Sequence, residues 1–169
     1  MPPFNHFTTK AKEAIRKAHE LAIERGQNHV NPLHLLTSLI IQEESVVTSI
    51  LDKLEVDTIL LTDSLIDEIE GVDSGQTISA SYQVYLTPEL AQLIENSAKI
   101  ALDLKDEFVS TEHLFIAALE TNGPARDLLT KFKLTKSQVL EVLDEVRSGT
   151  DEDAPIQKKF KTLSKYTRS

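Results

Sequence analysis

The 169-residue chain contains no cysteine and no tryptophan, and aromatic residues make up only 5% of it. The absence of cysteine excludes disulfide bonds, thiolate metal ligands and cysteine nucleophiles, and it fits the reducing cytoplasm in which we expect this protein. The five glycines and six prolines are few for this length, and their scarcity favours helices because both residues interrupt regular structure. No apolar run approaches the roughly 18 residues of a membrane-spanning helix. We therefore predict a soluble helical protein with no membrane partner.

The chain also has a deficit of positive charge. It carries 18 basic and 27 acidic residues, a formal net charge of −9. Nucleic-acid binding needs a basic surplus that releases counterions from phosphate, so we expect no nucleic-acid partner. The exception is the segment 156–169, which has five cations and no acid. This segment begins like a helix but has no C-terminal cap, which suggests that it continues into a longer polypeptide.

Apolar residues recur at helical spacing along most of the chain. Thr8 is the predicted N-cap of the first helix, and Gly26 is its stop. A second helix is predicted to open at Asn31-Pro32, and its nearly continuous apolarity indicates a central, buried position. Further helices are predicted at 45–54, from Asp57 to Gly71, from Thr87 to about Leu104, and from Thr135 onward.

The second half of the sequence repeats the first. Aligning Thr8 with Thr87 also aligns His34 with His113, and it gives six identities over 34 pairs, where chance gives roughly two. Thr8 and Thr87 are 79 positions apart; at a shift of 78 positions the match continues, since ILDKLEVD from Ile50 aligns with LLTKFKLT from Leu128, and a last helix follows from Thr135. We therefore predict an all-α fold of two pseudo-twofold four-helix repeats packed as one domain. Its parts are the domain 1–149, the repeats 7–70 and 86–147, and the linker 71–85.

Motifs for catalysis and for metal binding are missing. The chain has no glycine-rich phosphate loop and no G-x-S-x-G elbow, which argues against nucleotide hydrolysis and serine-hydrolase chemistry. The five histidines form no H-E-x-x-H motif and no i, i+4 pair, so no metal site is predicted. His34 and His113 are best interpreted as core or capping residues that the duplication reproduced. A helical enzyme that uses His29 and His34 with nearby acids is an alternative without a supporting motif.

Several short segments together carry a family resemblance. They are FNHFTTKA from Phe4, the paired motifs PLHLL and TEHLF, the phrase YLTPEL and the ending KTLSKYTR. With these segments the whole chain resembles the N-terminal (Clp N) domain of the ClpB family, the AAA+ disaggregases of the Clp heat-shock group. The resemblance implies that residues 150–169 form a linker and the start of a helix leading to an ATPase domain that is absent here.

The resemblance also implies a function. A domain of this kind is a non-catalytic substrate-recognition domain that binds unfolded or aggregated polypeptides through an apolar groove and passes them to the ATPase ring. It implies a monomer without cofactors for this chain, and a homohexamer that uses ATP and Mg²⁺ for the full-length parent, with adaptor proteins as further partners. The alternative is the adaptor- or substrate-binding N domain of a ClpC- or ClpA-like protease unfoldase, which the ending of the sequence disfavours.

Three positions match residues that the ClpB family links to substrate handling, namely Thr8, Asp106 and Glu112. Simpler roles are also open, because Thr8 could act only as an N-cap and Glu112 could serve only the helix dipole. The first repeat has Leu33 where the second has Glu112. Similar ClpC-type domains use acids in both repeats to hold phosphorylated arginine, so only one acidic half-site remains here.

Leu93 and Ile100 are the last predicted substrate contacts. With Ile94 as the centre of the apolar stripe, they fall at about −100° and −120° on a helical projection, beyond a typical core face. This placement predicts an apolar lip beside a groove. The alternative is that both side chains are buried against the other repeat or the linker.

Overall fold

The computed structural model describes residues 6–72 and 85–153. The described residues form eight helices, α1 (Thr9–Glu24), α2 (Pro32–Ile41), α3 (Val46–Lys53), α4 (Thr58–Val72), α5 (Pro88–Asp103), α6 (Thr111–Glu120), α7 (Pro124–Lys131) and α8 (Lys136–Asp153). Two short strands accompany them, β1 (His29–Val30) and β2 (Tyr85–Leu86). The basic segment 156–169 lies outside the described residues.

The predicted helix starts are confirmed by their hydrogen bonds. Thr8 Oγ1 accepts from the Ala11 N–H at 3.1 Å, and Asn31 Oδ1 accepts from the Leu33 N–H at 2.8 Å. Thr87 caps α5 in the same way as Thr8 caps α1. Each bond satisfies one of the N–H groups that the first turn of a helix leaves without a partner.

The turns that end the helices repeat the duplication in the backbone itself. Gly26, the predicted stop of the first helix, has φ 70°, and its repeat equivalent Lys105 has φ 62°. Glu55 and Lys133, which are also repeat equivalents, have φ values of 59° and 64°. This left-handed conformation is unfavourable for residues with a Cβ atom. Its presence at equivalent positions shows that the two halves share one chain path.

The two repeats are joined by reciprocal strand pairing. Thr8 N donates to Val109 O at 2.9 Å, and Thr87 N donates to Val30 O at 2.9 Å. The first contact extends a parallel bridge between Phe7 and Val109, and the second extends the parallel pair β1 and β2. Each repeat therefore pairs its first residues with the loop of the other repeat, as a pseudo-twofold arrangement requires.

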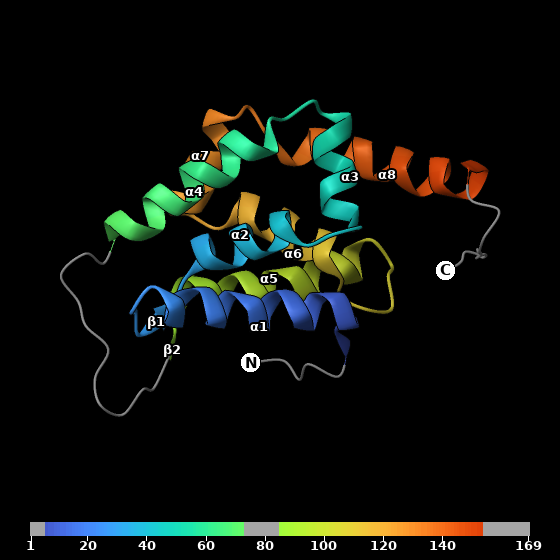
Figure 1. Cartoon of the computed structure of the whole chain (residues 1–169). Coiled ribbons are helices and arrows are strands. Elements are labelled where there is room, and N and C mark those ends of the chain that lie inside the picture. Colours follow the sequence, from blue (N-terminus) through green and yellow to red (C-terminus); the bar gives the residue numbers. More distant parts are fainter. Residues whose placement is uncertain (1–5, 73–84, 154–169) are drawn as a thin grey trace.

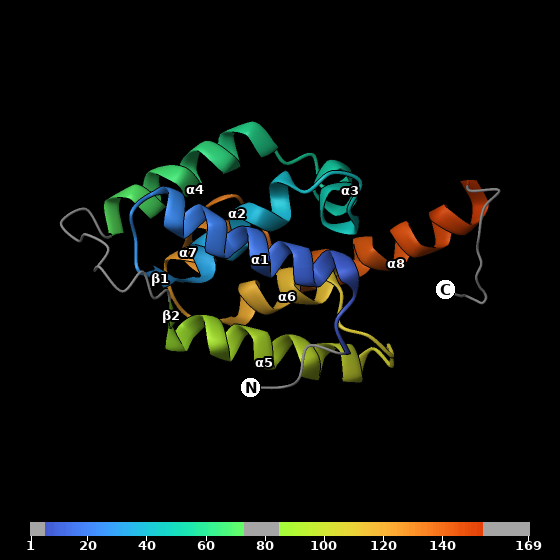
Figure 2. The same ribbon diagram turned by 60° about the horizontal axis from the view of Figure 1, so that its bottom comes forward.

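Helices α2 and α6 lie at the centre of the molecule. Figure 1 shows α1 and α5 on one side of this central pair and α4 and α7 on the other, and Figures 1 and 2 both show the end of α8 projecting outward. The side chains of α2 are buried from Leu33 to Ile40, which confirms its predicted central position. Apolar residues from both repeats form one continuous core. The predicted all-α fold of two repeats packed as one domain is thus observed.

The predicted boundaries need two small corrections. Helix α4 runs through Gly71 to Val72 and β2 includes Tyr85, so the linker predicted at 71–85 is too long at both ends. Helix α8 continues past Gly149 to Asp153, where a linker was expected. None of the helices in the described part of the chain is long and apolar enough to cross a bilayer.

The predicted apolar lip on α5 is wrong. Leu93 is 0% exposed and Ile100 is 6% exposed, and both belong to the core. Ser97 is also fully buried, with its hydroxyl donating to Ile94 O at 2.6 Å. The buried face is centred near this polar residue rather than on Ile94, so Leu93 and Ile100 lie only about 40° and 60° from its centre.

We expect Ile100→Ser to lower the free energy of unfolding by about 2–5 kcal/mol, because it removes a buried aliphatic group and leaves a hydroxyl in its place. Urea denaturation measures the change. The control is Leu102→Ser on the same helix, where the side chain is 76% exposed and a change within about 0.5 kcal/mol is expected. Equal losses for the two variants would contradict the burial of Ile100.

Candidate functional site

Two buried histidines start the central helices. His34 Nδ1 accepts from the Asn31 N–H at 3.0 Å, and His113 Nδ1 accepts from the Ser110 N–H at 2.9 Å. A backbone N–H can only donate, so in each neutral ring the hydrogen sits on Nε2. The interpretation of both residues as capping histidines is confirmed. Within the described residues, no group of three or more histidine and carboxylate side chains could hold a metal ion.

The second ring nitrogen of each histidine binds a different partner. His34 Nε2 donates to Gln27 Oε1 at 2.6 Å, whereas His113 Nε2 donates to Asp106 Oδ2 at 2.7 Å. Gln27 and Asp106 are themselves repeat equivalents. The Gln27 amide then donates to the backbone oxygen of Ile69 on α4 at 2.9 Å.

The surroundings of His34 disfavour its charged form. Burial, followed by the nearby His29 and Arg25, lowers the pKa of His34 from 6.5 to about 4. His34 is therefore neutral at physiological pH, as its capping role requires.

Asp106 belongs to an ionic cluster at the start of α6. Arg147 on α8 places its Nη2 atom 2.9 Å from Asp106 Oδ2 and 3.1 Å from Glu112 Oε2. Arg147 is the repeat equivalent of Ile69, so the second repeat uses a guanidinium where the first uses a backbone carbonyl. The Glu112 carboxylate is buried, and Arg147 is the cation that neutralises it.

Both carboxylates of this cluster are held in their charged form. Burial by itself raises the pKa of Asp106, but hydrogen bonds from His113 and Arg147 outweigh burial and bring the pKa below its usual value. Burial also raises the pKa of Glu112, and electrostatic interactions with the neighbouring His113 and Arg147 side chains outweigh that effect and bring the pKa below its usual value. The acidic half-site predicted from the sequence is thus already occupied by a cation of the same chain.

The structure brings three of the five predicted site residues to one end of the molecule. Asp106 and Glu112 both form ion pairs with Arg147. The Thr8 N–H donates to the backbone oxygen of Val109, a residue that lies between Asp106 and Glu112 in the sequence. Thr8 has the N-cap role described above, which does not exclude contact with a partner. The other two predicted residues, on α5, are in the core.

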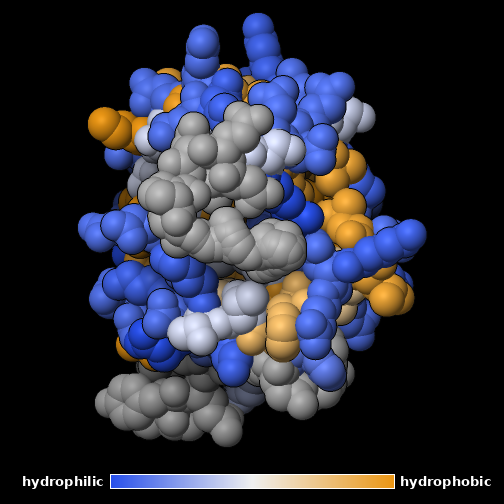
Figure 3. All heavy atoms as spheres, turned by 90° about the vertical axis from the view of Figure 1, so that its right-hand side faces the viewer, coloured by the Kyte–Doolittle hydropathy of each residue, from blue (hydrophilic) through white to orange (hydrophobic). Residues whose placement is uncertain are grey.

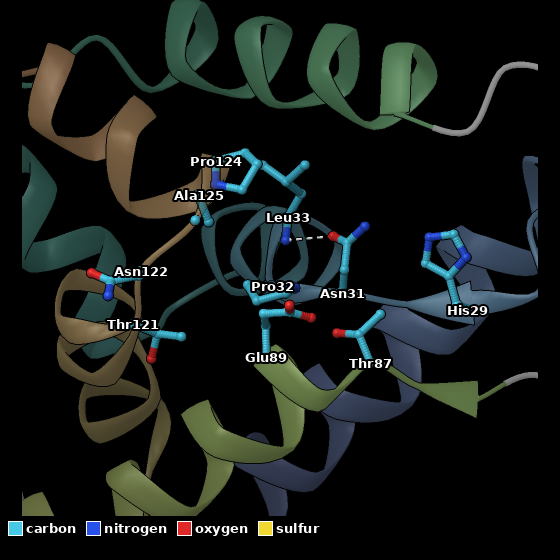
Figure 4. A pocket seen from close by; sticks show the side chains of 11 residues that line it. His29, Asn31, Pro32, Leu33, Thr87, Glu89, Thr121, Asn122, Pro124 and Ala125 are labelled. Carbon is cyan, nitrogen blue, oxygen red and sulfur yellow. Dashed lines mark hydrogen bonds between the residues drawn. The ribbon is translucent and has the colours of Figure 1, made fainter.

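A cavity lies where the starts of α2, α5 and α7 meet. It has a volume of about 290 Å³. Figure 4 shows Pro32 and Leu33 of α2, Pro124 of α7 and Glu89 of α5 around it. The remaining lining residues are His29, Asn31, Thr87, Thr121, Asn122, Gly123 and Ala125. We call this cavity the helix-start pocket.

The helix starts around this pocket share one sequence feature, a proline in the first turn. Helices α2, α5 and α7 each have proline in the first turn, after Asn31, Thr87 and Gly123. Proline at this position marks a helix start but says nothing about which starts lie together. Only the reciprocal pairing of the repeats brings these three to one place.

Other hydrophobic surface is dispersed. A second hollow of about 400 Å³ lies between the α3–α4 and α7–α8 turns, where Glu55 and Lys133 are among the lining residues. The face in Figure 3 is mostly hydrophilic, with hydrophobic groups gathered toward one side and interrupted by hydrophilic ones. The large apolar residues that are exposed are Ile23, Ile41, Ile59, Leu60, Tyr85, Leu102 and Phe108.

These features define a class of protein, an all-α domain built from two reciprocally paired four-helix repeats. The chain belongs to the family of Clp repeat (R) N-terminal domains, which matches residues 6–132. It is 32% identical to the chaperone protein ClpB of Bacillus cereus over 170 residues, covering 97% of this chain and 19% of that protein. The resemblance to the ClpB family is thereby confirmed. The chain spans about a fifth of the length of such relatives, and no ATPase domain is included in it.

Solved structures show the same fold. The N-terminal domain of the ClpV1 ATPase from E. coli superimposes with a TM-score of 0.71 at 20% identity, covering 91% of this chain and 93% of that one. A ClpV N-domain in complex with a VipB peptide superimposes with a TM-score of 0.64 at 19% identity, covering 84% and 89%. At these identities the likeness concerns the fold.

We expect His34 to make the protein less stable in mild acid. Its pKa is about 4 in the folded state and about 6.5 when unfolded, so below pH 6.5 the unfolded state binds the proton more readily. Stability falls as the pH is lowered, by about 2 kcal/mol near pH 5. Urea denaturation at about pH 7 and pH 5 measures this loss. Gln27→Glu, which puts a carboxylate beside the ring as in the second repeat, should reduce it, and a larger loss in that variant would contradict the assignment.

Arg147→Gln tests the ionic cluster. We expect it to destabilise the protein at neutral pH by about 1–3 kcal/mol, because it leaves Asp106 and Glu112 without their cation. The loss stays below that for a fully buried ion pair. The Arg147 side chain is 42% exposed, so solvent screens its charge.

The effect should depend on pH. The pKa values of both carboxyls are lowered in the folded state, so their stabilisation is present above the unfolded pKa of about 4 and is lost as the pH falls through the folded values. The difference in urea midpoint between variant and wild type should therefore be smaller at about pH 3 than at about pH 7. Arg16→Gln, which breaks a surface pair whose arginine is 68% exposed, is the control, with about 0.5 kcal/mol or less expected.

Proposed function

We propose that this chain is the polypeptide-recognition domain of a ClpB-type ATP-driven disaggregase and that it captures exposed segments of unfolded or aggregated proteins. The observation that carries the proposal is the helix-start pocket in a domain that resembles ClpB along its whole length. The complex of a ClpV N-domain with a VipB peptide supports it, because a domain of the same fold was solved with a peptide.

The pocket suits part of a polypeptide better than a cofactor. Its volume of about 290 Å³ is at the lower end for small-molecule sites and accommodates a few side chains. Pro32, Leu33, Pro124 and Ala125 supply apolar surface, and the amide of Asn122 on the exposed rim can hydrogen-bond a peptide backbone. An apolar floor with a few polar groups at its edge is typical of a recognition site.

Capture would be the first of two steps. Weak binding favours the second, in which the segment is passed to an ATPase ring that binds ATP and Mg²⁺. That ring would belong to the part of the protein that this chain, at about a fifth of the length of its ClpB relatives, does not include. A small contact area is consistent with weak binding, since affinity depends on a few well-buried groups.

An adaptor-binding role, as in a ClpC- or ClpA-like unfoldase, is the alternative. Such a role would rely on charged groups at the rim that remain free for a partner. The acidic cluster at the start of α6 does not meet this requirement, because Asp106 and Glu112 are paired with Arg147. We therefore favour direct capture of polypeptide.

Three substitutions of exposed polar residues by tryptophan locate the binding site. Asn122→Trp fills the helix-start pocket, Glu43→Trp lies at the equivalent position of the first repeat near Thr8, and Gln138→Trp fills the hollow between the α3–α4 and α7–α8 turns. We expect Asn122→Trp alone to weaken binding of fluorescein-labelled casein, an unfolded protein, by about tenfold.

Fluorescence anisotropy titrations measure the affinities, and urea midpoints verify that each variant is folded. Loss of binding in Glu43→Trp instead would assign the site to the end that holds Thr8, Asp106 and Glu112. Loss in Gln138→Trp would assign it to the second hollow. Wild-type affinity in all three variants would contradict each of these locations.

A further inference from the structure

The region of the other repeat that is equivalent to the helix-start pocket is bridged by hydrogen bonds within the chain. The alignment of the two repeats places Lys10 at the position of Glu89 and Glu43 at that of Asn122. Lys10 Nζ donates to the backbone oxygen of Glu43 at 2.9 Å, and Gln42 Nε2 donates to the backbone oxygen of Lys10 at 3.0 Å. A lysine of the chain itself thus ties the first turn of α1 to the α2–α3 turn.

Neither of these bonds exists in the helix-start pocket. Glu89 replaces the lysine, and its carboxylate has no hydrogen to donate across the gap. Thr121, which replaces Gln42, donates to Ala117 O at 2.8 Å within its own helix instead. Glu89 is exposed and takes part in no ion pair among the described residues. The pocket is therefore open, with a negative charge where its counterpart has a built-in cation.

The positive ends of nearby helices do not prevent a cation from binding there. The starts of α2, α5 and α7 surround the pocket, and each carries a partial positive charge. Lys10 itself lies in the first turn of α1, the positive end of a helix, and nevertheless forms its bond to Glu43. The net charge of −9 also favours a cationic partner through long-range attraction.

We propose that the helix-start pocket binds a polypeptide segment in which a lysine stands beside an aliphatic residue. The lysine ammonium pairs with Glu89 and donates to the backbone oxygen of Asn122, as Lys10 does to Glu43. The aliphatic neighbour packs on Leu33 and Ala125. This inference rests on the proposed capture of polypeptides and names the kind of segment that the pocket selects.

A pair of peptides tests this selectivity. Both are short, extended and fluorescein-labelled, with valine and leucine flanking one central residue, which is lysine in the first and glutamine in the second. We expect the wild-type chain to bind the lysine peptide about three- to tenfold more tightly, as for a partly exposed ion pair with an added hydrogen bond. The preference should weaken at high salt, because exposed charges are screened.

Glu89→Gln should remove the preference for lysine, and Glu89→Lys should weaken binding of both peptides because its own side chain can close the pocket as Lys10 does. Glu95→Lys makes the same change of charge at an exposed position of α5 outside the pocket. This control should retain the preference apart from the general effect of net charge.

The outcomes separate this inference from the proposed function. If both peptides bind with equal affinity and Asn122→Trp still weakens binding, the pocket captures polypeptides but does not select lysine, and the inference is overturned alone. If neither peptide binds and casein does not bind, the proposed function fails together with the inference. Retention of the lysine preference in Glu89→Gln would also overturn the inference.

Discussion

The near-complete burial of α2 and α6 is the constraint on which the rest of the structure depends. Almost no face of either helix reaches solvent, so the partly buried N–H groups at their starts are best satisfied by partners within the protein. His34 and His113 meet this need by accepting from the backbone N–H of the N-cap residue. Because a ring nitrogen that accepts carries no hydrogen, the fold fixes the ring hydrogen of each neutral histidine on Nε2.

The duplication kept this scaffold and changed the side chains around it. Gln27 and Asp106 bind equivalent histidines, but only the aspartate recruits a cation from the last helix. The difference leaves the start of α2 without a charged cluster and gives one to the start of α6. Leu33 accordingly lines an open pocket, while its equivalent Glu112 is held by Arg147.

This asymmetry bears on how such a domain can recognise a partner. A symmetric pair of acidic sites would favour ligands with two cationic groups. Here the acidic site of one repeat is paired with Arg147 of the same chain, and the equivalent region of the other repeat offers an apolar floor with Glu89 at its edge. The positions that differ between the repeats, rather than those that match, therefore define the chemistry of the surface that remains available.

None of the residues predicted from the sequence to contact substrate lines the helix-start pocket. The resemblance to ClpB singled out Thr8, Asp106 and Glu112, and the structure places them together. It gave no indication of Arg147, which lies 41 residues from Asp106 in the chain, because an arginine on a helix surface has no pattern that reveals its partner. It also misplaced Leu93 and Ile100, since a helical projection centred on apolar residues overlooked the buried Ser97.

By itself, the sequence determined the helices, their caps and the duplication. N-cap chemistry and apolar spacing act over a few residues, and a repeat is visible in the order of residues alone. Only the tertiary structure decided the reciprocal strand pairing, the burial of the α5 face, the ionic cluster at α6 and the pocket where three helix starts meet. Each of these joins segments that are distant in the chain, and their approach depends on how the two repeats pack as a whole, which local spacing does not encode.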